Sequence, residues 1–162
     1  MNLIVKITSL SFSEVFMLES KKNGWYAGGL AFQCQKCGKC CSGPDEGYIW
    51  VTRKEISLIA DYLKIPEENI RKLYTKSVGL RTSLLEQTQS RDCVFLQEIG
   101  GKKGCLIYPV RPNQCRTWPF WSDNLENANS WNRAAEKCPG VNRGDLCSLD
   151  KIELLRKQKS WW

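Results

Sequence analysis

Four cysteines lie within eight positions of the chain, in the stretch FQCQKCGKCCSGPDEG that spans residues 32–47. Two residues separate each of the first three, and a fourth follows directly; these are Cys34, Cys37, Cys40 and Cys41. Spacings of this kind let a turn direct consecutive sulfurs at one centre, and Gly38 allows the tight backbone path that such a loop needs. The side chains of the adjacent pair Cys40 and Cys41 are expected to diverge, so at most one easily completes the first site. Disulfide bonding, thiol redox exchange and metal coordination all use such a cluster.

The chain has 162 residues, nine cysteines and no histidine. Without histidine, neither a Ser-His-Asp triad nor a Cys-His nucleophile pair can be built, and mixed Cys-His zinc fingers are excluded. The phosphate-binding pattern G-x-x-x-x-G-K-[ST] does not occur either. We find no catalytic constellation, so the sequence gives no support to an enzyme activity. A bound metal would have to be held by thiolates, carboxylates, backbone or exogenous groups.

The N-terminal segment has a short apolar start that Lys6 and Glu14 interrupt. It therefore predicts neither a secretory signal nor a membrane span. Met17 could be the biological start, because the recognisable pattern begins later. We expect a cytoplasmic protein, in which thiols stay reduced and clustered cysteines more often indicate metal or catalysis than disulfides. The odd number of cysteines also fits poorly with a closed disulfide framework.

The formal net charge is +7, which would suit a protein that binds nucleic acid. The basic residues are scattered in pairs rather than gathered in a block, and that is typical of a solvated surface. Metal-bound cysteines are deprotonated, so a four-thiolate cluster would consume part of the positive excess. The charge pattern argues against a nucleic-acid partner, and a protein partner stays open.

Two helices are predicted after the cysteine loop. Thr52 and Glu55 fit a capping box, and apolar residues follow at i, i+3, i+4 and i+7 from Ile56, which predicts a helix over 52–64. Pro66 opens a second helix over 66–76. Its inward-facing residues are expected to be Ile70, Leu73 and Tyr74. The preceding GYIWVT, residues 47–52, reads as a short strand.

Further along, residues 92–109 read as a β-hairpin around a Gly- and Lys-rich turn. Cys93 is expected to open its first strand and Cys105 its second. A short helix starts near Pro112, carries Cys115 and ends close to Trp118, because Pro119 follows. Residues 122–138 are expected to be part loop and part helix. Ser148 caps a terminal helix over 148–159.

Four further cysteines thus arrive from separate elements: Cys93, Cys105, Cys115 and Cys138. Eight thiols in one small domain strongly favour metal binding. Cys147 lies outside the pattern and is interpreted as a small apolar residue. The expected fold is a small, irregular α+β domain stapled by metal, with short strands and two to four helices. Its boundaries are a lead-in over 1–24, a cysteine-cluster domain over 25–147, and a C-terminal helix and tail over 148–162.

These motifs resemble the YkgJ-type cysteine-cluster family, described as zinc- or iron-chelating. The matching motifs, in order, are CQKCGKCC, DCVFL, GCLIYPVRPNQCRTWPFW and CPG. The resemblance covers roughly residues 25 to 145 and implies metal binding. The family resemblance does not indicate which reaction, if any, the protein catalyses.

The metal and its use remain open at the level of sequence. Two zinc ions in four-thiolate sites and an iron–sulfur cluster both suit eight cysteines, with a slight preference for iron. The protein would store, carry or sense metal, transfer electrons through a cluster, or form a zinc-stabilised module that binds nucleic acid or protein. Arg111 and Arg116 bracket Cys115 and could stabilise a thiolate centre. Two further groups are weighed as neighbours of the centre: the aromatic residues Trp118, Phe120 and Trp121, expected mainly as core, and Asp45 and Glu46, expected mainly as a solvated turn.

Overall fold

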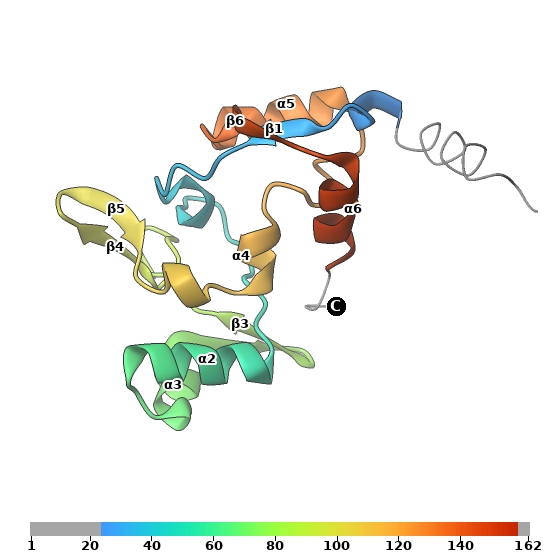
Figure 1. The fold of residues 1–162 in the computed structure, drawn as a ribbon. Helices are drawn as coiled ribbons and strands as arrows, with labels where there is room; N and C mark the ends of the chain where they lie inside the picture. Colours follow the sequence, from blue (N-terminus) through green and yellow to red (C-terminus); the bar gives the residue numbers. More distant parts are fainter. Residues whose placement is uncertain (1–23, 159–162) are drawn as a thin grey trace, which may run out of the picture.

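Short helices and antiparallel strand pairs make up residues 24–158, the part of the chain that the computed structural model describes, and the fold is α+β as expected (Figure 1). In order, the elements are η1 (Gly24–Tyr26), β1 (Leu30–Phe32), η2 (Lys39–Cys41), α2 (Arg53–Leu63), α3 (Glu67–Tyr74), β2 (Thr75–Val78), β3 (Arg81–Leu84), β4 (Leu96–Ile99), β5 (Lys102–Cys105), η3 (Tyr108–Val110), α4 (Asn113–Thr117), α5 (Ala128–Lys137), β6 (Val141–Cys147) and α6 (Leu149–Lys157). Nearly all of the predicted lead-in, the choice between Met1 and Met17, and the last residues of the tail lie outside the described residues.

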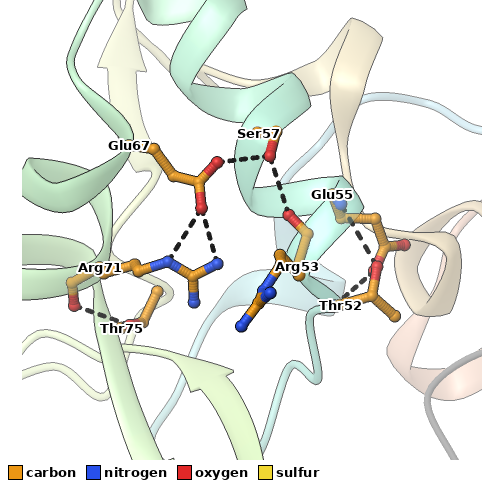
Figure 2. A network of polar contacts seen from close by, with 7 residues as sticks. All are labelled: Thr52, Arg53, Glu55, Ser57, Glu67, Arg71 and Thr75. Atoms are coloured by element: carbon orange, nitrogen blue, oxygen red, sulfur yellow. Dashed lines mark hydrogen bonds and ion pairs between the residues drawn. The ribbon is translucent and has the colours of Figure 1, made fainter.

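Helices α2 and α3 pack against each other, and a contact between Ser57 and Glu67 joins them. Thr52 and Glu55 form the predicted capping box. Ser57 and Arg71 both contact the carboxylate of Glu67, the arginine at 2.7 Å (Figure 2). The pair therefore starts at the residues that the capping and proline signals predict.

The prediction for the inward face of α3 is correct at two of three positions. Ile70 is buried and Tyr74 stacks on Phe95 with ring centroids 5.0 Å apart. Leu73, however, is 55% exposed. The helix has only eight residues and meets the core along the Ile70–Tyr74 line, so Leu73 lies beyond the edge of the contact.

The prediction of a strand over 47–52 is wrong. Only Trp50 forms an isolated bridge, to Ser83. The backbone N–H groups of Ile49 and Trp50 donate instead to side chains, the Ser83 hydroxyl at 3.0 Å and the Gln114 amide oxygen at 2.7 Å. Side-chain acceptors thus interrupt the backbone ladder. Two backbone hydrogen bonds to β3 remain: the N–H of Leu84 donates to the carbonyl of Ile49 at 2.8 Å, and the N–H of Val51 donates to the carbonyl of Thr82 at 3.0 Å.

The hairpin over 92–109 is confirmed, with shorter strands than expected. Gly100 and Gly101 turn it with φ of 59° and 75°, the left-handed pair of a tight hairpin turn. Because β4 and β5 have four residues each, Cys93 lies before β4, and Cys105 is the last residue of β5 rather than the first. A second hairpin, β2–β3, was not predicted.

Two hydrophobic cores lie at opposite ends of the molecule (Figure 1). The first core packs α2, α3 and the hairpins; its buried members include Ile56, Ile59, Ile70, Leu84, Phe95 and Ile107. The second core lies under β1, β6, α5 and α6; its buried members include Tyr26, Phe120, Trp131, Val141, Cys147 and Ile152. Strand β1 pairs with β6, which brings the two ends of the described chain together. The short helix α4 lies between the two cores (Figure 1).

Tyr26 ties the start of the described chain to α6 and makes the second core sensitive to alkali. Burial, together with a 2.8 Å hydrogen bond to Glu153, raises the pKa of Tyr26 to about 12. A raised folded-state pKa means that this stabilisation is present below the ordinary tyrosine pKa of about 10 and is lost as pH rises towards the folded-state value.

We therefore expect the stability advantage of wild type over Tyr26→Phe to shrink as pH rises from about 10. Chemical denaturation of both proteins across this range measures it. A difference in free energy of unfolding that does not change with pH would contradict the assignment.

Candidate metal centre

All eight cysteines predicted to bind metal line one cavity of about 80 Å³, and the ninth, Cys147, does not. We call this space the cysteine cavity; its cysteines are Cys34, Cys37, Cys40, Cys41, Cys93, Cys105, Cys115 and Cys138. None of the nine forms a disulfide, and all lie within the described residues. Cys147 is buried in the second core at 7% exposure, as its apolar interpretation predicts.

The cysteines come from elements of both cores. Cys93 belongs to the first core, and Cys41 and Cys105 pack against it. Cys138 ends α5 and packs against the second core. Between them, α4 supplies Cys115. A group held by these sulfurs would therefore join the two cores.

The sulfurs surround a space rather than a single point. Within residues 24–158, no three Cys, Asp or Glu side chains lie close enough together to hold one metal ion. The sulfurs of Cys40 and Cys41 lie 3.7 Å apart. The expectation that these two side chains diverge is wrong, because the 3₁₀ turn η2 aims both at the cavity.

Two hydrogen bonds fix the cysteine loop to the segment that leads into the β4–β5 hairpin, and Lys103 of β5 holds one of the acceptors in place. The N–H of Cys93 donates to the carbonyl of Cys41 at 2.7 Å. The carboxylate of Asp92 accepts from the N–H of Gly43 at 2.9 Å and from Lys103 at 2.8 Å. Sequence reasoning missed Asp92, since nothing in the local pattern distinguishes it from a surface carboxylate.

Gly38 has the left-handed conformation that the loop was expected to need. Its φ is 73°, and a Cβ there would lie 2.6 Å from the Cδ1 of Leu96. We expect Gly38→Ala to lower the free energy of unfolding by about 2 kcal/mol or more, from backbone strain and contact with β4, and to reduce bound metal.

Gly79→Ala is the matched control for this substitution. Gly79 also has a positive φ, 58°, but nothing lies within 4 Å of its would-be Cβ. The Gly79→Ala substitution should lower the free energy of unfolding by about 1–2 kcal/mol, from backbone strain alone, and leave bound metal unchanged. Chemical denaturation and elemental analysis measure both; equal metal loss in the two variants would exclude a role for the Gly38 contact.

Burial raises the pKa values of three thiols in the cysteine cavity. The pKa of Cys93 rises to about 12, and the pKa values of Cys105 and Cys115 rise as well. The hydrogen bond with Cys41 lowers the pKa of Cys40 to about 7 and raises that of Cys41. Metal ligation requires thiolates, so metal binding here would release protons.

Arg111 is the positive charge that faces these thiols. Its guanidinium lies 3.9 Å from the centroid of the Tyr108 ring and donates to the Tyr108 carbonyl at 2.7 Å. Sequence reasoning selected the arginine but missed the tyrosine that positions it. Arg116, the other predicted arginine, borders the cavity with an exposed side chain.

The three aromatic residues that follow Cys115 lie in different surroundings. Trp118 lines the cysteine cavity, whereas Phe120 belongs to the second core, where it stacks on Trp131. Trp121 donates to the carbonyl of Gln114 at 3.1 Å. The Nε1 of Trp118 is buried without a hydrogen-bond partner among the described residues. A thiolate or sulfide in the cavity would supply an acceptor, so this donor fits an anionic inorganic group.

Asp45 and Glu46 are exposed, as expected of a solvated turn, and do not line the cysteine cavity. Asp45 and Glu46 line a neighbouring cavity instead, and Glu46 lies 3.8 Å from Lys76. Among residues 24–158, no helix has the length and apolar character needed to cross a membrane.

Fold and cavity together define a small cysteine-rich domain whose thiols, although distant in sequence, face a common space. Residues 33–139 match the family model described as "CxxCxxCC: Putative zinc- or iron-chelating domain". The match covers more than half of the chain, so the protein belongs to this family, as the sequence motifs predicted.

A curated relative supports the assignment. The uncharacterized protein MJ0661 of Methanocaldococcus jannaschii is 38% identical over 95 residues, which is 59% of this chain and 48% of the relative. The chain thus spans about half the length of that relative. No solved structure matches the chain significantly.

Proposed function

We propose that the protein holds iron, as an iron–sulfur cluster, through the thiolates of the cysteine cavity. The observation that carries this proposal is that eight cysteines from separate parts of the chain line one cavity, with Cys93 in the first core and Cys138 packed against the second. Family membership supports zinc or iron binding. The ligand set, the domain boundary over 25–147 and a location in the reducing cytoplasm belong to the same proposal.

The spread of the sulfurs favours a cluster over a single ion. A tetrahedral zinc site needs four ligands about 2.3 Å from one point. Among the described residues no three candidate ligands approach such a point. A polynuclear cluster is wider and takes its thiolates at the periphery, which suits sulfurs that surround a space. When bound, it would supply one-electron transfer.

The surroundings of the cavity would tune such a centre. Arg111 lowers the cost of negative charge at Cys105 and Cys115, because its guanidinium is held close to both. Trp118 and Ile107 form part of an apolar wall that restricts water. These are the interactions that set cluster potentials in proteins.

Zinc is the second candidate, and one distance favours it. The Cys40 and Cys41 sulfurs are 3.7 Å apart. The edge of a four-thiolate zinc tetrahedron is about 3.8 Å, given zinc–sulfur bonds of about 2.3 Å. This pair could therefore be one edge of a zinc site.

Anaerobic purification followed by elemental analysis, a sulfide assay and an absorption spectrum separates the two metals. We expect a brown protein with iron and acid-labile sulfide. A colourless protein with stoichiometric zinc would support the second candidate. A protein that retains neither metal would contradict both.

Two measurements then separate the roles. A reversible spectral change on reduction would indicate electron transfer, whereas salt-dependent binding to nucleic acid would indicate an interaction module. The aromatic pair Tyr48–Trp50 argues against the role in nucleic-acid binding. Its rings stack on each other at 5.0 Å, and Lys76 and Arg81 lie over the outer faces, so no ring face is left for a base.

A further inference from the structure

A second cavity, of about 370 Å³, adjoins the cysteine cavity and shares part of its wall. We call it the side cavity. The residues that border both cavities are Cys40, Cys41, Cys93, Cys115 and Trp118. A molecule in the side cavity would therefore touch the sulfurs that the proposed function assigns to a metal centre. Its size is in the range of small-molecule sites, which start at about 300 Å³.

Two carboxylates of the side cavity are already occupied by the protein itself. Glu86 accepts from the N–H of Gly47 at 2.7 Å and lies 3.5 Å from the ammonium of Lys76. Glu46 lies 3.8 Å from the same ammonium. Lys76 offsets one of these two carboxylates, so about one negative charge remains on this side of the cavity.

Three cations of the side cavity are available. Lys39, Arg91 and Lys137 line it, and none of the three side chains makes an ion pair or hydrogen bond within residues 24–158. Asp45 is the one lining carboxylate in that range without a partner. These three cations face Asp45 and the one carboxylate charge that Lys76 does not offset, so a positive excess of about one charge remains, which favours an anion.

An aromatic wall faces the same space. Trp118 and Trp121 line the side cavity and pack edge to face, with ring centroids 4.8 Å apart and planes at 82°. Such walls bind flat apolar groups.

We propose that the side cavity binds a flat organic carboxylate. Its carboxylate faces Lys39, Arg91 and Lys137, and its apolar body lies against Trp118 and Trp121. The binding itself requires only residues of this chain. The consequence, that the bound anion lies beside a metal centre, rests on the proposed function.

Isothermal titration of the metal-containing protein with benzoate tests the inference. Benzamide and benzylamine have the same ring but are neutral and cationic, and inorganic phosphate is an anion without a ring. We expect benzoate to bind at least about tenfold more tightly than the other three, and more weakly as salt is raised. No benzoate binding, or equal binding of benzoate and any of the other three, would overturn the proposal.

Variants locate the site. Arg91→Gln and Lys137→Gln should each weaken benzoate binding by about three- to fivefold, the range for exposed ion pairs. Lys54→Gln is the control, since this exposed residue of α2 does not line the side cavity. Trp121→Ala removes part of the aromatic wall at a residue that lines the side cavity but not the cysteine cavity, and it should also weaken binding. Equal affinity in wild type and all of these variants would show that benzoate binds elsewhere.

Elemental analysis of the same samples keeps the two proposals separate. Metal without selective benzoate binding would overturn this inference and leave the proposed function standing. Selective benzoate binding by a chain that retains no metal would support the side cavity and overturn the proposed function.

Discussion

Cys105→Ser is expected to release the metal and to leave the domain unfolded or molten at 25 °C. Cys105 ends β5, packs against the first core and lines the cysteine cavity. A structural thiolate site contributes about 10 kcal/mol or more to folding, and a whole domain is stable by only about 5–15 kcal/mol. Loss of the centre would therefore remove most of the stability. Elemental analysis and chemical denaturation measure the two effects, and Cys37→Ser should behave in the same way.

The matched control is Cys147→Ala. Cys147 is also a cysteine at the end of a strand, and it is buried, but it belongs to the second core and does not line the cavity. Its loss should leave metal binding intact and cost about 1 kcal/mol from lost packing. Metal content that is equal in Cys105→Ser, Cys37→Ser and Cys147→Ala would exclude the ligand assignment.

Elements with a local cause could be predicted from the sequence. The capping box at Thr52 and the glycine pair of the β4–β5 turn are determined by neighbouring residues, and both form as predicted. The end of α4 before Pro119 has the same kind of cause. Pairings that depend on distant residues were missed. Strand β1 pairs with β6 more than a hundred positions away, and the failed strand over 47–52 depends on Gln114 and Ser83.

The same distinction applies to the site. Residue type and spacing selected the eight cysteines that line the cavity and set Cys147 apart. They could not reveal that Tyr108 positions Arg111, that Asp92 fixes the cysteine loop, or that Trp118 separates two cavities. Each of these depends on where a turn or hairpin lies in three dimensions. Periodicity and motif spacing do not carry that information.

Glu55→Ala is expected to lower the free energy of unfolding by about 2–4 kcal/mol and to weaken metal binding. Glu55 is 8% exposed, and its carboxylate joins two elements. One oxygen accepts from the N–H and hydroxyl of Thr52, both at 2.8 Å, which caps α2. The other accepts from the N–H of Asn113 at 2.7 Å, at the start of the helix that carries Cys115. Alanine would remove the cap, at about 0.5–2 kcal/mol, and leave the second donor unpaired, at about 1–3 kcal/mol.

Two variants separate these contributions. Thr52→Ala removes the cap but keeps the contact between Glu55 and Asn113, so it should cost about 1 kcal/mol and retain metal affinity. Glu67→Gln changes a half-buried carboxylate that contacts Ser57 and Arg71 rather than α4, so it should lower the free energy of unfolding only slightly and leave metal affinity near wild type (Figure 2). Chemical denaturation and a competition titration with a chelator measure stability and affinity. If Glu55→Ala matched Thr52→Ala in both, Glu55 would be a helix cap and nothing more. A larger effect on both would mean that the buried carboxylate holds Cys115 in place, so that the first core and the metal centre are coupled through one side chain.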